Sequence, residues 1–586
     1  MNRSEAADER FAEKYDIIIC GGGLAGLALA RQLSLYSPEL AVLVLERARR
    51  PLPESTLKVG ESTIESGAYY YAQVLQLEDY IEEHHLEKLG LRYFYGGGHR
   101  PLEERPEFGV DRFLPAKSYQ LDRGLLEDHL RHLVDAAPSV DLREGISVKD
   151  IAIDPSAPHH EVMVQRGERS WCVRGRWVVD ALGRRRLLQK KFDLGVEQEG
   201  TFSSAWFRVR GKLDVASLAP ESAVQWRQRV RESRWNSTNH LMGQGYWVWL
   251  IPLSPGNTSI GIVASEEFHP LSQFNSYDKA LAWLQQHEPL LAQEVTRYEL
   301  MDFKRLHNYS YTSKQLFSLD RWCCVGDAAA FADPYYSVGS NMIGFTNGLA
   351  CRLVQLEREG RLEKTFVDHA NRLFLTLNDA LTDTIHRGYP FHHNGQVMAM
   401  KTIWDYYIGW TTTDPQFYHD VYLEPKQART MSSLITRIVV AQARMMRLFE
   451  DWAKRRPEPT YTFDFIDYIQ DLPTLRKLFV RNLPPRHERF REVLANLREA
   501  IGHIEELAHV IFFFAVRDVL PEQAERLAEH PWIEITAIGL DPDRWQADGL
   551  FAPKTLARDL GPLSGEIGAL FRPVGAPPSA TMAPAR

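Results

Sequence analysis

The N-terminal region carries the pattern that most restricts the fold of this chain: a β-prone run, a glycine turn, a helix and a second β-prone run. The first run, at 15–20, is apolar and leads into Gly21-Gly22-Gly23-Leu24-Ala25-Gly26. A helical pattern continues through Leu33, and the second run, at 41–45, ends at Glu46. This order predicts a βαβ unit and hence an α/β fold.

Three glycines of the turn, Gly21, Gly23 and Gly26, have the GxGxxG spacing typical of dinucleotide-binding domains. Glycines let the backbone approach a pyrophosphate, and the free N–H groups at the helix N-terminus favour an anion. Glu46 follows at the separation from which an acidic side chain accepts hydrogen bonds from ribose hydroxyls. The unit therefore predicts a dinucleotide site.

Length and composition narrow the class of protein further. A chain of 586 residues, 44% of them hydrophobic, can form two or three domains. Its net charge of −8 is spread over interspersed charged residues, which argues against a nucleic-acid or anionic-lipid partner. Five scattered cysteines without a CxxC pair predict reduced thiols, no metal site and a cytoplasmic location. The sequence shows neither a secretory leader nor a run of the roughly 20 apolar residues that a transmembrane helix needs.

A second segment, 322–340, passes from a short apolar strand through Gly326-Asp327 into small residues. Turns of this kind bring the backbone close to a ligand, so the segment predicts a cofactor cradle. Between the two glycine-rich segments, a β-type alternation predicts an inserted, substrate-facing sheet. The predicted organisation is a dinucleotide domain in two parts (1–200 and 307–395), the β-rich segment (201–306), a helical C-terminal region (396–572) and a disordered Pro/Ala-rich tail (573–586).

A helix predicted to begin near residue 122 has Arg123 in its first turn. A cation there is unfavourable to the helix dipole unless an anion lies nearby. Arg123 is therefore a candidate phosphate ligand, and a surface ion pair with Glu127 is the alternative.

Two further motifs carry a family resemblance. Residues 246–252 read WxWxIP through Trp247, Trp249, Ile251 and Pro252, and residues 331–339 read FxxPxxSxG through Phe331, Pro334, Ser337 and Gly339. Tryptophans at i and i+2 also suit plain core packing, because they share one face of a strand. Together with GxGxxG and the turn Gly60-Glu61-Ser62, however, the motifs resemble those of the flavin-dependent, tryptophan-halogenase-like family over about 15–348.

The resemblance implies the fold of the FAD-dependent aromatic hydroxylases: a Rossmann-type FAD-binding domain with an inserted β-rich substrate domain and a helical C-terminal extension. It also implies a role in secondary metabolite biosynthesis. Reduced FAD and O2 would give a C4a-hydroperoxide, which chloride or bromide attacks to form hypohalous acid. A separate flavin reductase would supply FADH2. Gly326 and Asp327 would hold the ribityl and phosphate side of FAD, and Arg123 its pyrophosphate.

The same resemblance assigns the remaining site residues. The backbone amides of Val338 and Gly339, beside Ser337, would bind halide in a turn. Lys88, followed by Gly90, stands where the family carries its halogen-transferring lysine, which hydrogen-bonds hypohalous acid or forms a chloramine. The alternative is a solvated lysine at a charged helix end. Glu61 is a second catalytic candidate, which either orients its turn or positions polar atoms near the flavin.

Two departures from the family bear on the substrate. Tyr336 precedes the motif serine, where halogenases of free tryptophan carry a glutamate, so the substrate is expected to be a phenol, a pyrrole or a carrier-tethered aryl intermediate. Ser340-Asn341 follows the motif glycine, where many relatives have an apolar residue. This difference leaves open which halide the turn prefers and whether it binds halide for halogenation. Two other functions remain open: a flavin monooxygenase that hydroxylates or epoxidises without halogenation, and a flavin-dependent reductase.

Overall fold

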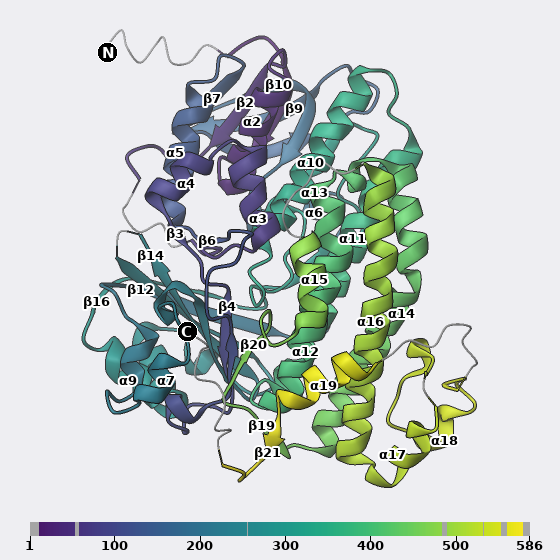
Figure 1. The fold of residues 1–586 in the computed structure, drawn as a ribbon. Coiled ribbons are helices and arrows are strands. Elements are labelled where there is room, and N and C mark those ends of the chain that lie inside the picture. The colour runs from purple at the N-terminus through teal and green to yellow at the C-terminus, as the bar shows by residue number, and fades with distance from the viewer. Residues whose placement is uncertain are drawn as a thin grey trace. The chain divides into compact units, whose positions relative to one another are not determined.

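The computed structural model describes residues 11–52, 58–254, 256–482, 489–530, 532–551 and 560–577. The chain divides into two compact units, each assembled from separate segments. Figure 1 shows the elements of both, coloured along the chain. Unit 1 comprises Met1–His85, Leu121–Glu199 and Tyr309–Thr382, and unit 2 comprises Leu86–Gln120, Gly200–Asn308 and Asp383–Arg586.

Unit 1 is built on a seven-stranded sheet with the order β7-β2-β1-β10-β9-β8, in which β18 also pairs with β10. β1 pairs in parallel with β2 and β10, whereas β8, β9 and β10 pair antiparallel. The strands are β1 (Tyr15–Cys20), β2 (Val42–Glu46), β7 (Val140–Glu144), β8 (Ser147–Ala152), β9 (His160–Arg166), β10 (Arg169–Asp180) and β18 (Trp322–Cys324), and a separate pair is β11 (Gly195–Glu197) with β17 (Tyr311–Ser313).

The βαβ prediction is confirmed. α2 (Leu24–Tyr36) follows the glycine turn directly and leads to β2. β1 is apolar throughout its buried core because a parallel strand is covered on both faces. The other helices of this unit are α3 (Glu65–Tyr69), α4 (Glu78–His84), α5 (Arg123–Asp135), α6 (Leu187–Lys191), α10 (Gly339–Arg358) and most of α11 (Lys364–His386).

Unit 2 is built on an eight-stranded sheet with the order β16-β12-β15-β14-β13-β4-β5-β20. The predicted β-rich segment supplies β12 (Phe202–Arg210), β13 (Thr238–Gly243), β14 (Tyr246–Leu253), β15 (Asn257–Ser265) and β16 (Glu299–Leu306). The sheet also takes β4 (Leu91–Phe94), β5 (Glu107–Gly109) and β20 (Phe465–Asp467) from outside that segment. Because β4 pairs in parallel with β13, the stretch that carries Lys88 clusters with unit 2 and not with the glycine turn.

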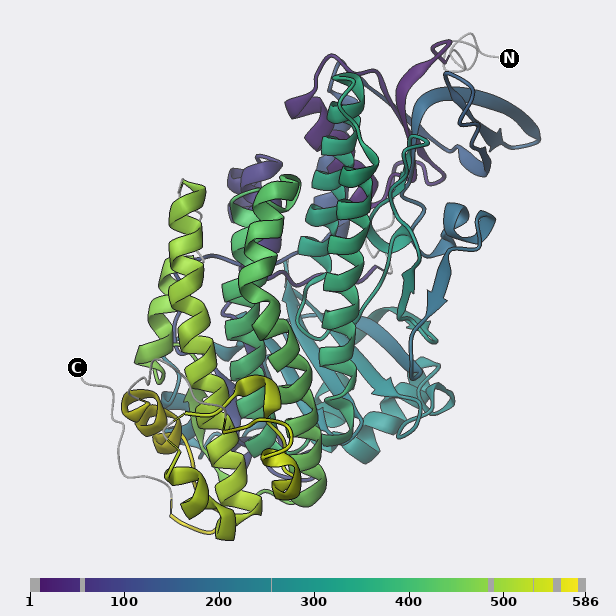
Figure 2. The same ribbon diagram turned by 90° about the vertical axis from the view of Figure 1, so that its right-hand side faces the viewer.

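The C-terminal region of unit 2 is mainly helical, and Figure 2 shows its long helices α14 (Pro425–Arg455) and α16 (Phe490–Val519) side by side. The shorter helices of this region are α12 (Gly395–Ile408), α13 (Asp414–Tyr418), α15 (Pro473–Asn482), α17 (Pro521–Ala528), α18 (Pro542–Trp545) and α19 (Gly561–Ala569). The β-rich segment adds α7 (Val224–Gln228), α8 (Tyr277–His287) and α9 (Pro289–Val295).

Small strand pairs complete unit 2, namely β3 (Leu86–Glu87) with β6 (Tyr119–Gln120) and β19 (Tyr461–Thr462) with β21 (Arg572–Pro573). Pro573, at the start of the predicted disordered tail, is thus paired with Tyr461, and residues 578–586 lie outside the described residues. Among the described residues, no helix combines the length and the hydropathy that crossing a membrane requires.

Candidate active site

The glycine turn after β1 has a geometry that suits phosphate binding. Gly21 has a φ of +114°, and a Cβ on it would lie 2.3 Å from the Ala181 carbonyl oxygen. A Cβ on Gly26 would lie 2.0 Å from the Gly21 carbonyl oxygen. Gly23 is the N-cap of α2 without a side-chain cap, and a Cβ on it would meet nothing within 4 Å. The first-turn N–H groups of α2 are thus left for a ligand, and the cradle fits a diphosphate.

The Glu46 carboxylate is held at the glycine turn. It accepts hydrogen bonds from the Gly22 N–H at 2.8 Å and from the Ala48 N–H at 2.7 Å. A carboxylate has about four acceptor positions, so it can also accept from a ribose hydroxyl. Arg131, which the sequence motifs did not single out, donates to the Gly22 carbonyl at 2.9 Å from the buried face of α5. The sequence feature that could have indicated Arg131 is its position as a basic residue among the apolar positions of that helix.

The Gly326-Asp327 turn packs against the first turn of α2. Gly326 has a φ of +56°, and a Cβ on it would lie 2.5 Å from the Ala25 Cβ, so only glycine fits this contact. Its N–H donates to the Thr346 hydroxyl at 3.2 Å. Desolvation raises the pKa of the partly exposed Asp327, and the guanidinium groups of Arg184 and Arg123 oppose the shift. Because burial disfavours the charged form of this carboxylate, a ligand that donates hydrogen bonds to it would be stabilising.

Asp327→Asn is expected to raise the thermal midpoint of the FAD-free protein at pH 7 and to weaken FAD retention. Since the folded-state pKa lies above the usual value of 3.8, the charged carboxylate costs stability progressively as pH rises through that pKa. Thermal melts between pH 4 and 8 should therefore show a midpoint difference that grows with pH. Equal midpoints for the two proteins at every pH would contradict the assigned environment of Asp327.

Arg123 forms the ion pair with Glu127 that its position in the sequence offered as the alternative to a phosphate-binding role. Its guanidinium donates to the Val59 carbonyl and, at 2.6 Å, to Glu127. Glu127 is 1% exposed and also pairs with Lys58, so the ion pair is present but buried and not at the surface. Among the described residues, the buried Nε of Arg123 has no hydrogen-bond partner. That orphaned donor fits an anionic ligand, and the pyrophosphate role stays a prediction.

The predicted halide turn stands at the N-terminus of α10. Ser337 is left-handed, with a φ of +58°, and its N–H donates to the Pro334 carbonyl at 3.0 Å. Val338 is the N-cap and has no side-chain cap, and a Cβ on Gly339 would meet nothing within 4 Å. The amide donors of a helix start and the open space beside Gly339 suit a small anion, and halide binding stays a prediction. Ser340, which departs from the family pattern, is buried in the first turn.

Three other predicted residues of unit 1, Glu61, Phe331 and Tyr336, form contacts within that unit. Glu61 is 1% exposed, and its carbonyl accepts from the Leu121 N–H at 2.5 Å. The structure thus ties its turn to the segment that leads into α5, and its two candidate roles stay open. Phe331 forms an isolated bridge with Tyr311 and lies under the Arg184 guanidinium, 5.6 Å from the ring centroid. Tyr336 is buried, with its ring 4.6 Å from that of its neighbour Tyr335.

Lys88 lies in unit 2, between β3 and a tight turn. The residue is 4% exposed, so it is not a solvated lysine at a charged helix end. The backbone fixes it from both sides, because its N–H donates to the Ser118 carbonyl at 2.8 Å and the Leu89 N–H donates to the Asn236 carbonyl at 2.9 Å. Gly90 closes the turn with a φ of +60°. A buried lysine on a backbone held in this way suits a chemical role, which stays a prediction.

His240 on β13 is a neighbour of Lys88 that no sequence motif indicated. Burial lowers its pKa to about 3, and the Lys88 charge adds to the shift, so the ring is neutral at physiological pH. The ring stacks on Tyr93 at 4.6 Å, and its Nδ1 lies 3.0 Å from the Arg92 carbonyl oxygen. The parallel pairing of β4 with β13 sets these contacts.

The WxWxIP residues form part of the core on β14. The indole N–H of Trp247 donates to the Tyr389 hydroxyl at 3.0 Å, and that of Trp249 donates to the Ser259 hydroxyl at 3.2 Å. Ile251 and Pro252 continue the strand, paired with β15. Core packing therefore describes both tryptophans, and their role toward a substrate stays a prediction.

Comparison with protein families places residues 14–349, more than half of the chain, in the FAD binding domain. Among curated proteins, the chain is similar to a flavin-dependent halogenase, chlA, of Dictyostelium discoideum, with 31% identity over 57% of this chain and 59% of that protein. The chain thus spans less than two thirds of this relative. It is also similar to a 1H-pyrrole-2-carbonyl-[peptidyl-carrier protein] chlorinase of Pseudomonas fluorescens, with 27% identity over 56% of this chain and 72% of that protein.

Solved structures share the fold. The halogenase PltM in complex with phloroglucinol and FAD aligns with a TM-score of 0.60 and 17% identity, over 88% of this chain and 98% of that one. The flavin-dependent brominase Bmp2 aligns with a TM-score of 0.53 and 21% identity, over 65% of this chain and 88% of that one. The predicted Rossmann-type FAD-binding fold is confirmed, and FAD is the cofactor that the cradle of unit 1 fits.

Proposed function

We propose that this chain, which belongs to the FAD binding domain family, is a flavin-dependent halogenase of electron-rich aromatic rings. The observation that carries the proposal is Lys88, a lysine that is 4% exposed and whose backbone is held by hydrogen bonds, in a protein with an intact FAD cradle. FAD binding alone would be compatible with many reactions. A lysine withdrawn from water is the additional feature that halogen transfer requires.

The proposed halogenation assigns separate roles to FAD, to the halide turn and to Lys88. FAD, when bound in reduced form, supplies with O2 the oxidising equivalent that converts halide to hypohalous acid. The amides of Val338 and Gly339 hold the halide, and the left-handed backbone of Ser337 orients them. Lys88 presents the halogen, either by hydrogen-bonding hypohalous acid or as a chloramine. The aromatic carbon then bonds to halogen, its proton is lost, and the oxygen leaves in water.

Tyr336 and the names of the relatives support a substrate class. Without a carboxylate before Ser337, we expect a phenol, a pyrrole or an aryl group on an acyl or peptidyl carrier protein. The pyrrole-carrier halogenases among the relatives support the carrier-bound form. A separate flavin reductase would deliver FADH2.

The purified protein, supplied with FADH2, O2 and bromide or chloride, is expected to halogenate members of a panel of phenols and pyrroles, free and carrier-bound. Mass spectrometry identifies the product, because the halogen isotope pattern must change when one halide replaces the other. A product that gains oxygen without any dependence on halide would instead indicate a monooxygenase. Absence of any O2-dependent product would favour a reductase.

A further inference from the structure

Helix α15 carries an unbalanced positive charge on an acidic protein. Its ten residues, Pro473–Asn482, include Arg476, Lys477 and Arg481 and no Asp or Glu, whereas the whole chain has a net charge of −8. Arg476 and Lys477 are exposed, as is Val480 between them and Arg481. A local excess of one sign attracts a partner of the other sign and orients its approach.

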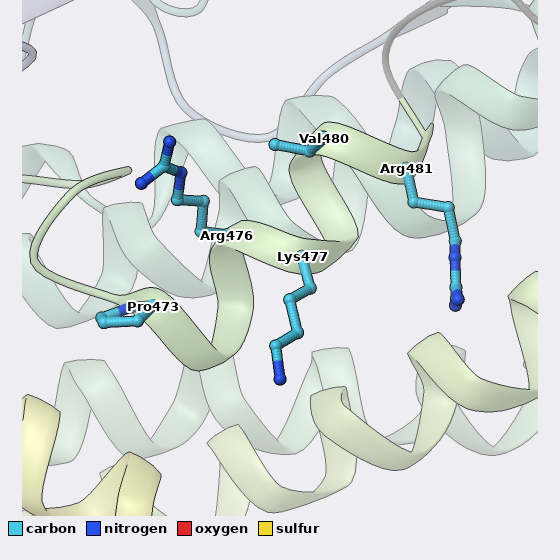
Figure 3. A pocket seen from close by; sticks show the side chains of 5 residues that line it. All are labelled: Pro473, Arg476, Lys477, Val480 and Arg481. Atoms are coloured by element: carbon cyan, nitrogen blue, oxygen red, sulfur yellow. The ribbon is translucent and has the colours of Figure 1, made fainter.

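One of the three cations of α15 forms an ion pair. Arg481 pairs with Glu499 of α16, whereas neither Arg476 nor Lys477 forms an ion pair within the described ranges of the chain. The three side chains, with Pro473 and Val480, line an open hollow of about 450 Å³. Figure 3 shows them extending from one helix, with the apolar Val480 beside Arg481. This basic face, as we call these five residues, offers an apolar contact and two exposed cations without an ion pair among the described residues, of which Lys477 acts on Glu499 through its charge.

The opposite side of α15 is buried in an aromatic cluster. Phe479 packs against Trp410 with ring centroids 4.6 Å apart. Trp410 also packs against Tyr406 and Tyr407, at 5.3 and 5.1 Å. It belongs to the π-helical segment Gly409–Thr413 that follows α12, and π-helical turns inside helices are frequent at functional sites.

The aromatic cluster reaches the turn that carries Lys88. Tyr468 packs against Tyr406 at 5.1 Å, and a Cβ on Gly90 would lie 2.5 Å from the Tyr468 hydroxyl. Only a glycine therefore fits between Tyr468 and the chain two residues after Lys88. All these residues belong to unit 2, so the contacts from the basic face to the lysine turn run through one compact body.

We propose that the basic face of α15 docks an acidic carrier protein that presents the aromatic substrate on its phosphate-containing tether. The inference rests on the proposed halogenase function with a carrier-bound substrate. Arg476 and Lys477 match carboxylates on the carrier and the phosphate of the tether, and Val480 offers the apolar contact that a helical carrier surface needs. The aromatic cluster beneath α15 connects this docking site to the Lys88 turn by packing contacts.

The test compares wild type with Arg476→Glu/Lys477→Glu on two substrates: a 1H-pyrrole-2-carbonyl-loaded peptidyl carrier protein and the same panel of free phenols and pyrroles. The double variant is expected to lower kcat/KM for the carrier-bound substrate by about tenfold or more at low salt, and the difference should shrink at high salt. Turnover of free substrates, FAD content and the thermal midpoint should not change, because both side chains are exposed.

The matched control is Lys149→Glu/Lys304→Glu, which makes the same charge change at exposed sites outside α15 and should leave both substrates unaffected. Equal loss in this control, or no loss in the α15 variant, would overturn the docking site. If wild type halogenates free substrates but not the carrier-bound one, the result contradicts the docking site and supports the proposed function. If it halogenates neither kind of substrate, the result contradicts both the docking site and the proposed function.

Discussion

Replacing Lys88 by Met is expected to lower kcat/KM for halogenation by about 100-fold or more while FAD binding stays as in wild type. A positioned group that takes part in the chemical step typically contributes 10²- to 10⁴-fold. Methionine has a similar length and no charge, so it suits a site that is 4% exposed and should not prevent folding. Product formation by mass spectrometry and FAD content by absorbance are the two measurements.

Lys88→Arg separates the two roles left open for the amine. Arginine keeps the positive charge and can hydrogen-bond hypohalous acid, but its guanidinium is not deprotonated and does not serve as a nucleophilic amine. Partial activity would favour the hydrogen-bonding role, and loss equal to that of Lys88→Met would favour the chloramine. The exposed Lys304→Met serves as the matched control for the loss of one lysine in unit 2. Full activity of Lys88→Met would remove this residue from the mechanism.

Alanine substitutions at two glycines of the GxGxxG turn, Gly26 and Gly23, are expected to have different effects on stability and on FAD binding. A Cβ on Gly26 would lie 2.0 Å from the Gly21 carbonyl oxygen, so Gly26→Ala must deform the turn and should lower both the thermal midpoint and FAD affinity. A Cβ on Gly23 meets nothing within 4 Å in the protein itself. Gly23→Ala should therefore leave the thermal midpoint of the FAD-free protein unchanged, yet weaken FAD binding by roughly 10- to 100-fold, because hydrogen bonds to the charged diphosphate lengthen.

Fluorescence titration with FAD and thermal melts of the FAD-free protein distinguish the two outcomes. Gly195→Ala is the control, since its Cβ also meets nothing within 4 Å and it lies on exposed β11, which is not part of the glycine turn. Wild-type FAD affinity in Gly23→Ala would show that the diphosphate does not approach the N-terminus of α2.

Sequence patterns were most reliable where function depends on local backbone geometry. The GxGxxG turn lies directly before the helix that it starts, so its spacing indicated it, whereas Ser337 was indicated by the family motif and its left-handed backbone only by the structure. The patterns were least informative about partners far along the chain. Arg123 illustrates the limit: the sequence offers its pairing with Glu127, four residues away, as an alternative at the surface, but it indicates neither the contact with Val59 nor the burial of the ion pair.

The sequence by itself determined the βαβ unit and its glycine turn for a dinucleotide, because these depend on glycine spacing and apolar runs, and the family resemblance of its motifs indicated FAD and the candidate lysine. Only the tertiary structure decided that Lys88 is buried, that it clusters with unit 2 and that the neutral His240 lies beside it. The physical reason is that burial and sheet pairing are non-local. β4 pairs with β13, and their contact depends on the whole sheet and not on the residues around the lysine.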